Sequence, residues 1–154
     1  MKAVIQRVSE ASVTVENELV SEIQNGFLIL LGVHEDDSKE DAEILAKKVA
    51  NLRVFEDADE KMNLSLLDLD YSCLVISQFT LLADTKKGNR PSFIQAARPE
   101  QAIPLYEYFM EQLQANGVKE VKHGIFGADM KVRLLNDGPV TIVYDTTQWV
   151  ARKA

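Results

Sequence analysis

Residues 2–15 read KAVIQRVSEASVTV, and along this stretch apolar residues alternate with polar ones. Such alternation is typical of one or two half-buried β-strands. Gly26 then interrupts the chain, and the continuous apolar run FLILL follows at 27–31. A short run of this kind, rich in β-forming residues, indicates a central strand buried on both faces. These two stretches predict that a β-sheet forms the centre of the fold.

Two amphipathic helices are predicted elsewhere in the chain. Ser38, followed by an acidic residue three positions later, is a typical helix N-cap, and apolar residues at helical spacing extend the first helix over 39–52. The second helix begins near Pro99, a residue suited to a first helical turn, and ends at an Asn-Gly stop signal at 116–117. Pro104 either delays the start of this helix or kinks it.

The number and spacing of the strands decide the fold class. Six or more strands separated by gaps of hairpin length, together with two helices, predict an α+β fold with a mostly antiparallel, barrel-like sheet. No repeat, linker or change of composition divides the sequence, so we expect a single domain over residues 1–154. The further stretches interpreted as strands are 18–23, 73–76 with its extension 77–81, 118–121, 131–135 and 140–145, with 137–139 between the last two.

Composition narrows the class of protein. The 154 residues are 46% hydrophobic and 27% charged, which excludes a disordered or low-complexity chain. The longest apolar stretch, residues 27–33, is far shorter than the ~20 residues of a membrane-spanning helix. The single Cys73 cannot form a disulfide within the chain. We therefore expect a soluble, cytoplasmic protein that has no membrane partner.

Charge is distributed unevenly along the chain. The net charge is −7, and residues 35–70 account for all of it with 12 acidic and 5 basic residues. Residues 83–98 are the opposite case, because four cations stand there against Asp84 alone. The chain lacks the strongly basic profile of a dedicated nucleic-acid-binding protein. A local basic face could still contact a few phosphates, and the alternative is a set of ordinary solvated charges. The four cations are Lys86, Lys87, Arg90 and Arg98.

Familiar catalytic and metal-binding motifs are absent from the sequence. His34 and His123 are the only histidines, and neither has the spacing of a metal-binding pair. Cys73 lies inside an apolar run, where a thiol is usually part of the packing. There is no P-loop, dinucleotide-binding fingerprint or nucleophile elbow. We predict neither a metal site nor a cofactor.

Two short segments carry polar or conformationally special residues where strands are predicted. Residues 77–80, SQFT, end a buried strand, and their side chains and main-chain N–H groups could face a ligand and form an oxyanion site. The alternative for this segment is a polar strand end. Gly138-Pro139 is the second segment, and by itself this dipeptide is ordinary turn chemistry.

The same two segments carry a family resemblance. SQFTL at 77–81 and GPVT at 138–141 resemble the two signature motifs of the D-aminoacyl-tRNA deacylases (the D-Tyr-tRNA deacylase family). The opening MKAVIQRV, GNRPSF at 88–93 and FGADMKV at 126–132 extend the resemblance over essentially the whole chain. It implies a barrel-like sheet with two main helices packed outside, which agrees with the fold predicted above.

The resemblance also implies a homodimeric hydrolase. Members of the family cleave the ester between a D-amino acid and the 3′ adenosine of tRNA, remove glycine mischarged on alanine tRNA, and spare L-aminoacyl-tRNA. Gly138-Pro139 would be a cis dipeptide that each subunit inserts into its partner's active site. Its main chain would reject an L side chain by clash, whereas glycine has no side chain to clash. Arg7 resembles the residue that anchors this dipeptide, although alone it would be interpreted as an edge-strand charge.

The remaining site residues follow from the same resemblance. Phe79, Phe126 and Met130 would hold the terminal adenine, whereas without the resemblance they would be interpreted as core packing. Charge alone adds a prediction that the cations of 86–90 contact phosphates of the acceptor end. The catalytic segment would consist of Ser77, Gln78, Phe79 and Thr80.

Two mechanisms remain open for the hydrolysis. The Thr80 hydroxyl could attack the ester, but a threonine nucleophile needs an activating base, and neither histidine belongs to a recognisable dyad. In the second mechanism the protein positions the ester, main-chain N–H groups near Phe79 and Thr80 stabilise the oxyanion, and the 2′-OH of the tRNA assists water. We favour the second mechanism.

Two other classes of function compete with the hydrolase. A non-catalytic module could bind aminoacyl-tRNA or a ligand that resembles a D-amino acid. A structural dimerisation domain would be favoured if the Gly138-Pro139 bond were trans and faced solvent.

Overall fold

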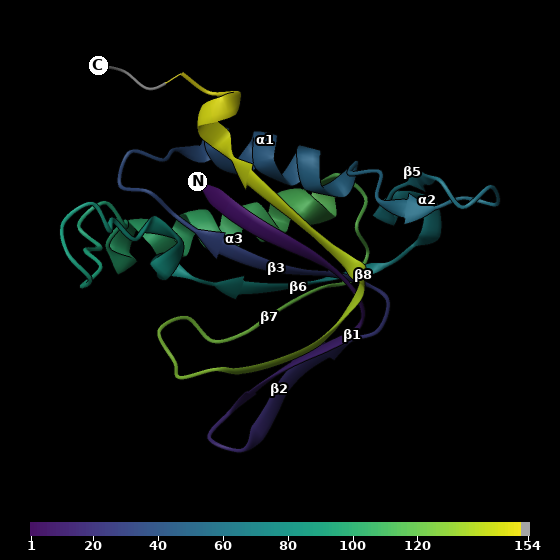
Figure 1. Cartoon of the computed structure of the whole chain (residues 1–154), viewed down its shortest axis with the longest axis horizontal. Coiled ribbons are helices and arrows are strands. Elements are labelled where there is room, and N and C mark those ends of the chain that lie inside the picture. The colour runs from purple at the N-terminus through teal and green to yellow at the C-terminus, as the bar shows by residue number, and fades with distance from the viewer. Residues whose placement is uncertain (152–154) are drawn as a thin grey trace.

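A six-stranded mixed sheet forms the body of the protein in the computed structural model, which describes residues 1–151 (Figure 1). Its strands follow the order β2-β1-β3-β6-β7. β2 and β3 pair with different halves of one edge of the long strand β1, and β8 pairs with the opposite edge. A separate two-stranded sheet consists of β4 and β5. The strands are β1 (Lys2–Val15), β2 (Glu18–Ile23), β3 (Gly26–Gly32), β4 (Phe55–Glu56), β5 (Met62–Leu64), β6 (Ser72–Ser77), β7 (Val121–His123) and β8 (Lys131–Asp145).

Strand direction divides the large sheet into two halves. β1 runs antiparallel to β2, β3 and β8, whereas β3 and β6, and likewise β6 and β7, pair in parallel. Parallel neighbours need long crossover connections, and α1 (Lys39–Ala50) and α3 (Pro99–Ala115) lie in these connections. The α+β fold with two main helices is therefore confirmed, but the sheet is more mixed than the hairpin-length gaps predicted.

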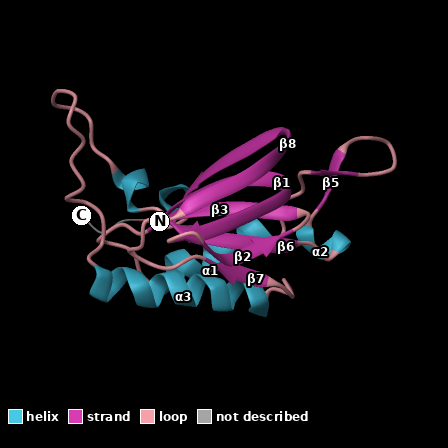
Figure 2. Cartoon of the chain, turned by 90° about the horizontal axis from the view of Figure 1, so that it is seen from below, coloured by secondary structure: helices cyan, strands magenta, loops and turns pink. Residues whose placement is uncertain are grey.

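Side-chain hydrogen bonds join β2 and β7, the first and last strands in the order of the sheet. The Ser21 hydroxyl of β2 donates to the His123 carbonyl of β7 across 2.7 Å, and the Lys122 ammonium donates to the Glu22 carbonyl across 2.8 Å. Within residues 1–151, β2 and β7 share no backbone ladder, so these two bonds bridge the gap between them. The result is a nearly closed, barrel-like sheet with both helices along one side (Figure 2).

Apolar side chains fill both faces of the sheet. On the helix side, Phe27 of β3 and Phe109 of α3 are fully buried and belong to one cluster. On the inner side, Leu28 and Leu74 belong to a second cluster. Successive residues of a strand point to opposite faces, so β3 and β6 contribute to both clusters. This confirms the prediction of two central strands that are buried on both faces.

The sequence signals locate both main helices closely. Ser38 and Asp41 form a capping box in which the Ser38 N–H donates to the Asp41 carboxylate at 2.9 Å, and α1 ends two residues before the predicted limit. α3 begins at Pro99 and continues through Pro104, so Pro104 does not delay its start. A single-turn helix, α2 (Leu66–Leu69), adds to them within the acidic segment. Among residues 1–151, no helix is both long and apolar enough to cross a lipid bilayer.

Three strand predictions change in the structure. Residues 79–82 form the 3₁₀ turn η1 (Phe79–Leu82) instead of extending β6, which ends at Ser77. The strand predicted at 118–121 is the shorter β7, shifted towards the C-terminus. The strands predicted at 131–135 and 140–145 are the single strand β8, because the segment between them is a bulge and not a turn.

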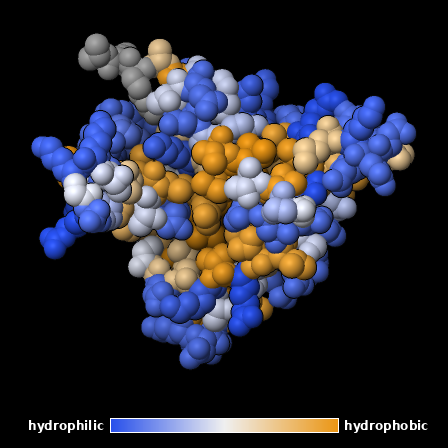
Figure 3. Space-filling model, viewed as in Figure 1, coloured by the Kyte–Doolittle hydropathy of each residue, from blue (hydrophilic) through white to orange (hydrophobic). Residues whose placement is uncertain are grey.

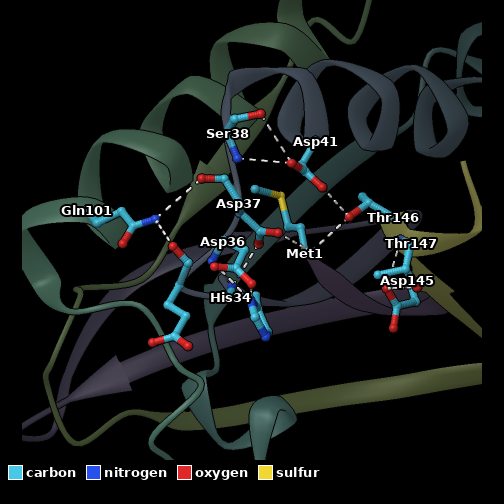
Figure 4. A network of polar contacts seen from close by, with 11 residues as sticks. Met1, His34, Asp36, Asp37, Ser38, Asp41, Gln101, Asp145, Thr146 and Thr147 are labelled. Atoms are coloured by element: carbon cyan, nitrogen blue, oxygen red, sulfur yellow. Dashed lines mark hydrogen bonds and ion pairs between the residues drawn. The ribbon is translucent and has the colours of Figure 1, made fainter. Parts of the chain in front are cut away.

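A buried polar network fastens the start of β1 to the helical layer (Figure 4). The Met1 amino group donates to the Asp37 carboxylate at 2.7 Å and to the Thr146 hydroxyl at 2.8 Å. That hydroxyl donates in turn to the Asp41 carboxylate of α1 at 2.6 Å. Thr146 begins the 3₁₀ turn η2 (Thr146–Gln148) after β8. The network therefore holds β1, α1 and the end of β8 in one arrangement.

Candidate active site

A pocket of 270 Å³ opens where β6 ends. One wall consists of residues 76–79, at the passage from β6 into η1, and the other consists mainly of the 126–130 loop between β7 and β8. Two motifs that lie far apart in the sequence therefore meet in one cavity. Five of the predicted site residues line it: Ser77, Gln78, Phe79, Phe126 and Met130.

Local backbone geometry explains why the chain forms a cavity at this point. The Gln78 N–H donates to the Leu31 carbonyl of β3 at 2.8 Å, and directly beyond this bond the chain winds into η1. On the opposite wall, Gly124 leaves room for the side chain of Met130, because a Cβ atom at Gly124 would collide with the Met130 sulfur.

Aromatic rings frame the pocket. Phe79 is 57% exposed and meets Phe93 edge to face, with ring centroids 5.1 Å apart. Phe126 is partly buried and makes an edge contact with Tyr106 at 6.3 Å. An exposed ring held by a second ring offers a face on which a flat ligand can stack. Core packing therefore describes Phe126 better than Phe79.

The main chain of η1 provides hydrogen-bond donors that the protein does not use. Among the described residues, the N–H groups of Phe79 and Thr80 have no hydrogen-bond acceptor, because the first N–H groups of a helical turn have no partner within it. The Thr80 side chain is not part of the pocket wall, and its hydroxyl accepts a hydrogen bond from the Gln78 amide. No imidazole, carboxylate or amine of the described chain is bonded to this hydroxyl.

The pocket carries little charge. Asp129 is the only ionisable residue in its wall; the side chain is 83% exposed and forms an ion pair with Lys131 at 3.2 Å. Both histidines lie outside it: the His34 ring accepts from the Asp36 N–H, and the His123 ring contacts the Gly124 carbonyl. Within residues 1–151, no three His, Cys, Asp or Glu side chains are grouped so that they could hold a metal ion.

Two buried titratable side chains lie in or against β6: Cys73 belongs to the strand, and Tyr106 supports it near the pocket. The Tyr106 phenol donates to the Val75 carbonyl at 2.6 Å, and burial raises the pKa of Tyr106 well above its ordinary value. Burial likewise raises the pKa of the Cys73 thiol, which is fully enclosed. Both groups therefore stay neutral, and Cys73 serves in packing, as its apolar surroundings predicted.

Gly138 and Pro139 lie in a bulge of β8. Four residues, 137–140, stand opposite the single Arg7 of β1 at this point of the ladder. The Asn136 side chain spans the bulge: its oxygen accepts from the Val140 N–H at 3.0 Å. Gly138 and Pro139 are exposed, and the peptide bond between them is cis, in agreement with the resemblance.

Arg7 of the neighbouring strand β1 is hydrogen-bonded to this bulge. Its guanidinium is buried, and it donates to the Asp137 carbonyl at 2.9 Å and to the Val54 carbonyl at 2.6 Å. A third contact, 3.3 Å to the carboxylate of Glu56, lies nearer the surface, because the Glu56 side chain is 50% exposed. Arg7 is therefore an anchor for main chain on both sides and not an edge-strand charge.

The pocket and the bulge lie at opposite ends of the sheet within one chain. Arg7 pairs with Phe27, which pairs with Cys73 of β6, whereas Ser77 pairs with Leu31. Four residue steps along β6, from Cys73 to Ser77, separate these two rows, which is about 13 Å along the strand. Arg7, Gly138 and Pro139 consequently do not line the pocket that holds the other predicted residues.

Sequence reasoning missed three contacts of these two regions. The Val54 carbonyl is 47 positions from Arg7, and nothing in the sequence indicates the bond between them. Asn136 lies two residues before the GPVT motif, and Phe93 is the last residue of the GNRPSF stretch of the resemblance. A larger cavity of 520 Å³ between β2 and β8 contains none of the predicted site residues.

The fold and the pocket define a small α+β barrel whose site offers aromatic rings and main-chain donors in place of a side-chain acid–base pair. A family model described as D-Tyr-tRNA(Tyr) deacylase matches residues 4–145. D-aminoacyl-tRNA deacylases from Flavobacterium psychrophilum and Bacteroides fragilis are 58% and 60% identical over 146 residues, which cover 95% of this chain and 97% of each relative. The chain therefore belongs to the D-aminoacyl-tRNA deacylase family, and it is an enzyme, an ester hydrolase.

Two solved structures share this fold. A protein described as a c-Myc DNA unwinding element binding protein is 46% identical, with a TM-score of 0.88, and the match covers 94% of this chain and 98% of that one. A protein described as a probable eukaryotic D-amino acid tRNA deacylase has a TM-score of 0.79 over 93% of this chain and 97% of its own. At 17% identity, the second comparison supports the fold alone.

Proposed function

We propose that this enzyme hydrolyses the ester bond of D-aminoacyl-tRNA in the cytoplasm, releases the free D-amino acid and tRNA, and rejects L-aminoacyl-tRNA. The observation that carries the proposal is the pocket in which the 77–79 segment meets the 126–130 loop. Its size and low charge suit a nucleoside with a short ester-linked group. The names of the relatives from two bacteria support the same substrate class.

The pocket suits the terminal adenosine of the tRNA. A base can stack on the exposed ring of Phe79, which Phe93 holds in place, while Phe126 and Met130 close the opposite wall. Stacking of a base on an aromatic ring contributes about 1–3 kcal/mol to binding. With the adenine held there, the ester at the ribose would lie near the N–H groups of Phe79 and Thr80.

The mechanism that fits these groups is positioning with oxyanion stabilisation. The two unused N–H groups of η1 can donate to the oxyanion that forms when water attacks the ester carbonyl. The 2′-OH of the tRNA assists that water, because no base of the described chain contacts the Thr80 hydroxyl. A donor of this kind typically accounts for about 3–4 kcal/mol of barrier lowering.

Rejection of the L ester is assigned to Gly138-Pro139 of a second subunit. The dipeptide is exposed and lies about 13 Å along the sheet from its own pocket, so a partner's pocket is the site it can reach. The main-chain atoms of this dipeptide, placed against the α-carbon of the substrate's amino acid, would clash with an L side chain and would admit D side chains and glycine. Glycine mischarged on alanine tRNA would therefore also be removed.

β8 offers a surface for that second subunit. Within residues 1–151 it pairs with β1 alone, and three of its apolar side chains are exposed: Leu134, Leu135 and Val143, at 37%, 57% and 66%. Figure 3 shows apolar residues gathered across the middle of the face on which β8 runs. An open strand edge with exposed apolar side chains is a template for pairing with another chain, so a homodimer is expected.

The first test is deacylation of three substrates by the purified protein, with EDTA present. They are D-Tyr-tRNA, L-Tyr-tRNA and alanine tRNA that is mischarged with glycine. We expect the D and glycyl esters to be lost while the L ester persists. Equal loss of D and L esters would leave an ester hydrolase without the chiral filter. No loss of any ester while tRNA is retained on a filter would instead favour a non-catalytic binding module.

A second test addresses the shared site. Phe79→Ala damages the pocket, and Gly138→Ala damages the bulge, so each variant alone should be weakly active. In a mixed dimer, one site would carry both defects and the other would carry neither. Refolding the two variants together should therefore restore about a quarter of the wild-type rate, since half of the dimers are mixed. If each chain held a complete site, mixing would restore nothing.

A further inference from the structure

The loop between η1 and α3, residues 83–98, projects from the body of the protein as an arm (Figure 2). Near its base, Asp84 and Ser92 exchange both backbone hydrogen bonds, at 2.8 and 2.9 Å. Further back, residues 95–97 are bonded to the main chain of residues 33–35. The arm therefore has a base that is fastened to the sheet and a tip that stands away from it.

The tip carries cations that have no partners. Lys86, Lys87 and Arg90 are exposed, and within residues 1–151 none of these side chains forms an ion pair or a hydrogen bond. The only acidic residue of the arm, Asp84, is occupied, because its carboxylate accepts from the Lys86 N–H at 3.0 Å. Gly88, with φ at +67°, turns the chain between the cations. The arm is thus a concentrated positive charge on a protein whose net charge is −7.

The arm is connected directly to the pocket. It leaves η1, whose Phe79 lines the pocket, and Phe93 of the arm packs against the Phe79 ring at 5.1 Å. From Phe93 to the tip at Gly88 is five residues, which can reach at most about 17 Å. One nucleic-acid strand rises about 3.4 Å per nucleotide, so the arm can span the first few phosphates inward from a base held in the pocket.

We propose that this arm binds the sugar–phosphate backbone of the tRNA acceptor end, directly inward of the terminal adenosine. The inference rests on the proposed function, because it takes tRNA as the substrate. The pocket holds the adenosine and the ester, and none of its lining residues is a cation that could bind a phosphate. The three cations supply that contact, which is independent of sequence and sensitive to salt because bound counterions are released.

The test compares two substrates on the variant Lys86→Gln/Lys87→Gln/Arg90→Gln. One substrate is D-Tyr-tRNA, and the other is the D-tyrosyl ester of adenosine, which has no phosphate. For D-Tyr-tRNA we expect KM to rise at least about tenfold at 0.1 M salt, and its slope against salt on logarithmic axes to fall by about 2 to 3. For the adenosine ester we expect kcat/KM to stay unchanged.

A matched control removes the same charge elsewhere. Lys47→Gln/Lys61→Gln/Lys119→Gln changes three exposed lysines of α1, of the turn before β5 and of the segment after α3. We expect this control to keep the wild-type KM and salt slope, because an effect of net charge alone would move both variants equally. Equal behaviour of the two variants would overturn the proposal.

Three other outcomes would also overturn it. Wild-type KM on D-Tyr-tRNA in the arm variant would show that the arm does not touch the substrate. An equal loss on both substrates would show that the arm only supports the pocket through Phe93. A change of oligomeric state would assign the arm to the subunit interface. Failure of the proposed function would be distinct, because the wild-type protein would then hydrolyse neither substrate.

Discussion

The pocket at the end of β6 and the bulge of β8 are built in opposite ways. The pocket rests on a strand buried on both faces and braced by Tyr106, so its geometry is fixed by many neighbours. The bulge is exposed main chain, and the buried Arg7 holds it through the Asp137 carbonyl. Many neighbours support the strand beneath the pocket, whereas the bulge depends on two side chains, Arg7 and Asn136, and is therefore the more fragile region.

The largest effect is expected from Arg7→Ala. The substitution leaves the carbonyls of Val54 and Asp137 without their donor and opens a cavity, so unfolding should become easier by about 3 kcal/mol. Deacylation by the folded fraction should fall at least about a hundredfold, because the bulge loses its anchor. Urea unfolding and the rate on D-Tyr-tRNA measure the two losses.

Glu56→Gln is the matched control for this change. The Glu56 carboxylate is half exposed, so its ion pair with Arg7 contributes less than about 1 kcal/mol. An equally large loss in this control would mean that the ion pair, and not the bond to main chain, holds the bulge.

Gly138→Ala should act on the bulge with a smaller cost in stability. At φ +139° an added Cβ would lie 2.8 Å from the Val140 side chain and 3.2 Å from the Arg7 guanidinium, so the main chain must move. We expect the rate on D-Tyr-tRNA to fall about a hundredfold, which corresponds to about 2.7 kcal/mol. Gly117→Ala, at φ +110° and far from both regions, carries the same backbone strain. Loss of activity in that control as well would make strain, and not the position of the bulge, the cause.

Alkaline pH should weaken the region around β6 specifically. Burial raises the pKa of Cys73 and Tyr106 in the folded protein, so the unfolded chain loses these protons first as pH rises. The contribution of these two groups to the free energy of unfolding should therefore be constant below about pH 8.5 and then fall, by up to about 1.4 kcal/mol per pH unit for each group. Urea unfolding at pH 7.5 and 9.5 tests this. In Cys73→Ala the fall should start only near pH 10, where Tyr106 of the unfolded chain begins to titrate, and an unchanged profile would exclude the thiol as its source.

The smallest effect is expected from Thr80→Ala. The Thr80 hydroxyl lies outside the pocket wall and, in the described part of the chain, is bonded to the Gln78 amide alone, so the rate on D-Tyr-tRNA should stay within about threefold of wild type. Loss of an essential nucleophile typically lowers kcat by about 10⁴-fold or more. A loss of that size, with an acyl-enzyme trapped by acid quench, would replace the positioning mechanism by covalent catalysis.

Local signals in the sequence predict one of the two regions better than the other. The runs at 27–31 and 73–76 locate the strands beneath the pocket, because continuous apolar residues leave few other structures open. The sequence instead predicts a turn at the bulge, because the contacts that form the bulge leave no local signal. These contacts are the hydrogen bond from the Val140 N–H to the Asn136 side chain and the bond from Arg7 to a carbonyl 47 positions away. Parallel pairing was missed for a similar reason, because strand direction depends on the path of the connecting helices.

The closure of the barrel between β2 and β7 has a consequence for motion. Two side-chain bonds, from Ser21 and Lys122, take the place of a backbone ladder there, so the seam can open without unfolding the strands on either side. β7 leads directly into the 126–130 loop, and any opening of the seam would widen the cavity lined by that loop. Within residues 1–151, β7 pairs through its backbone with β6 alone, whereas β3 is paired on both edges, so amide protons of β7 should exchange with solvent faster than those of β3. The rate at which a nucleotide enters the pocket would then depend on how often β2 and β7 separate.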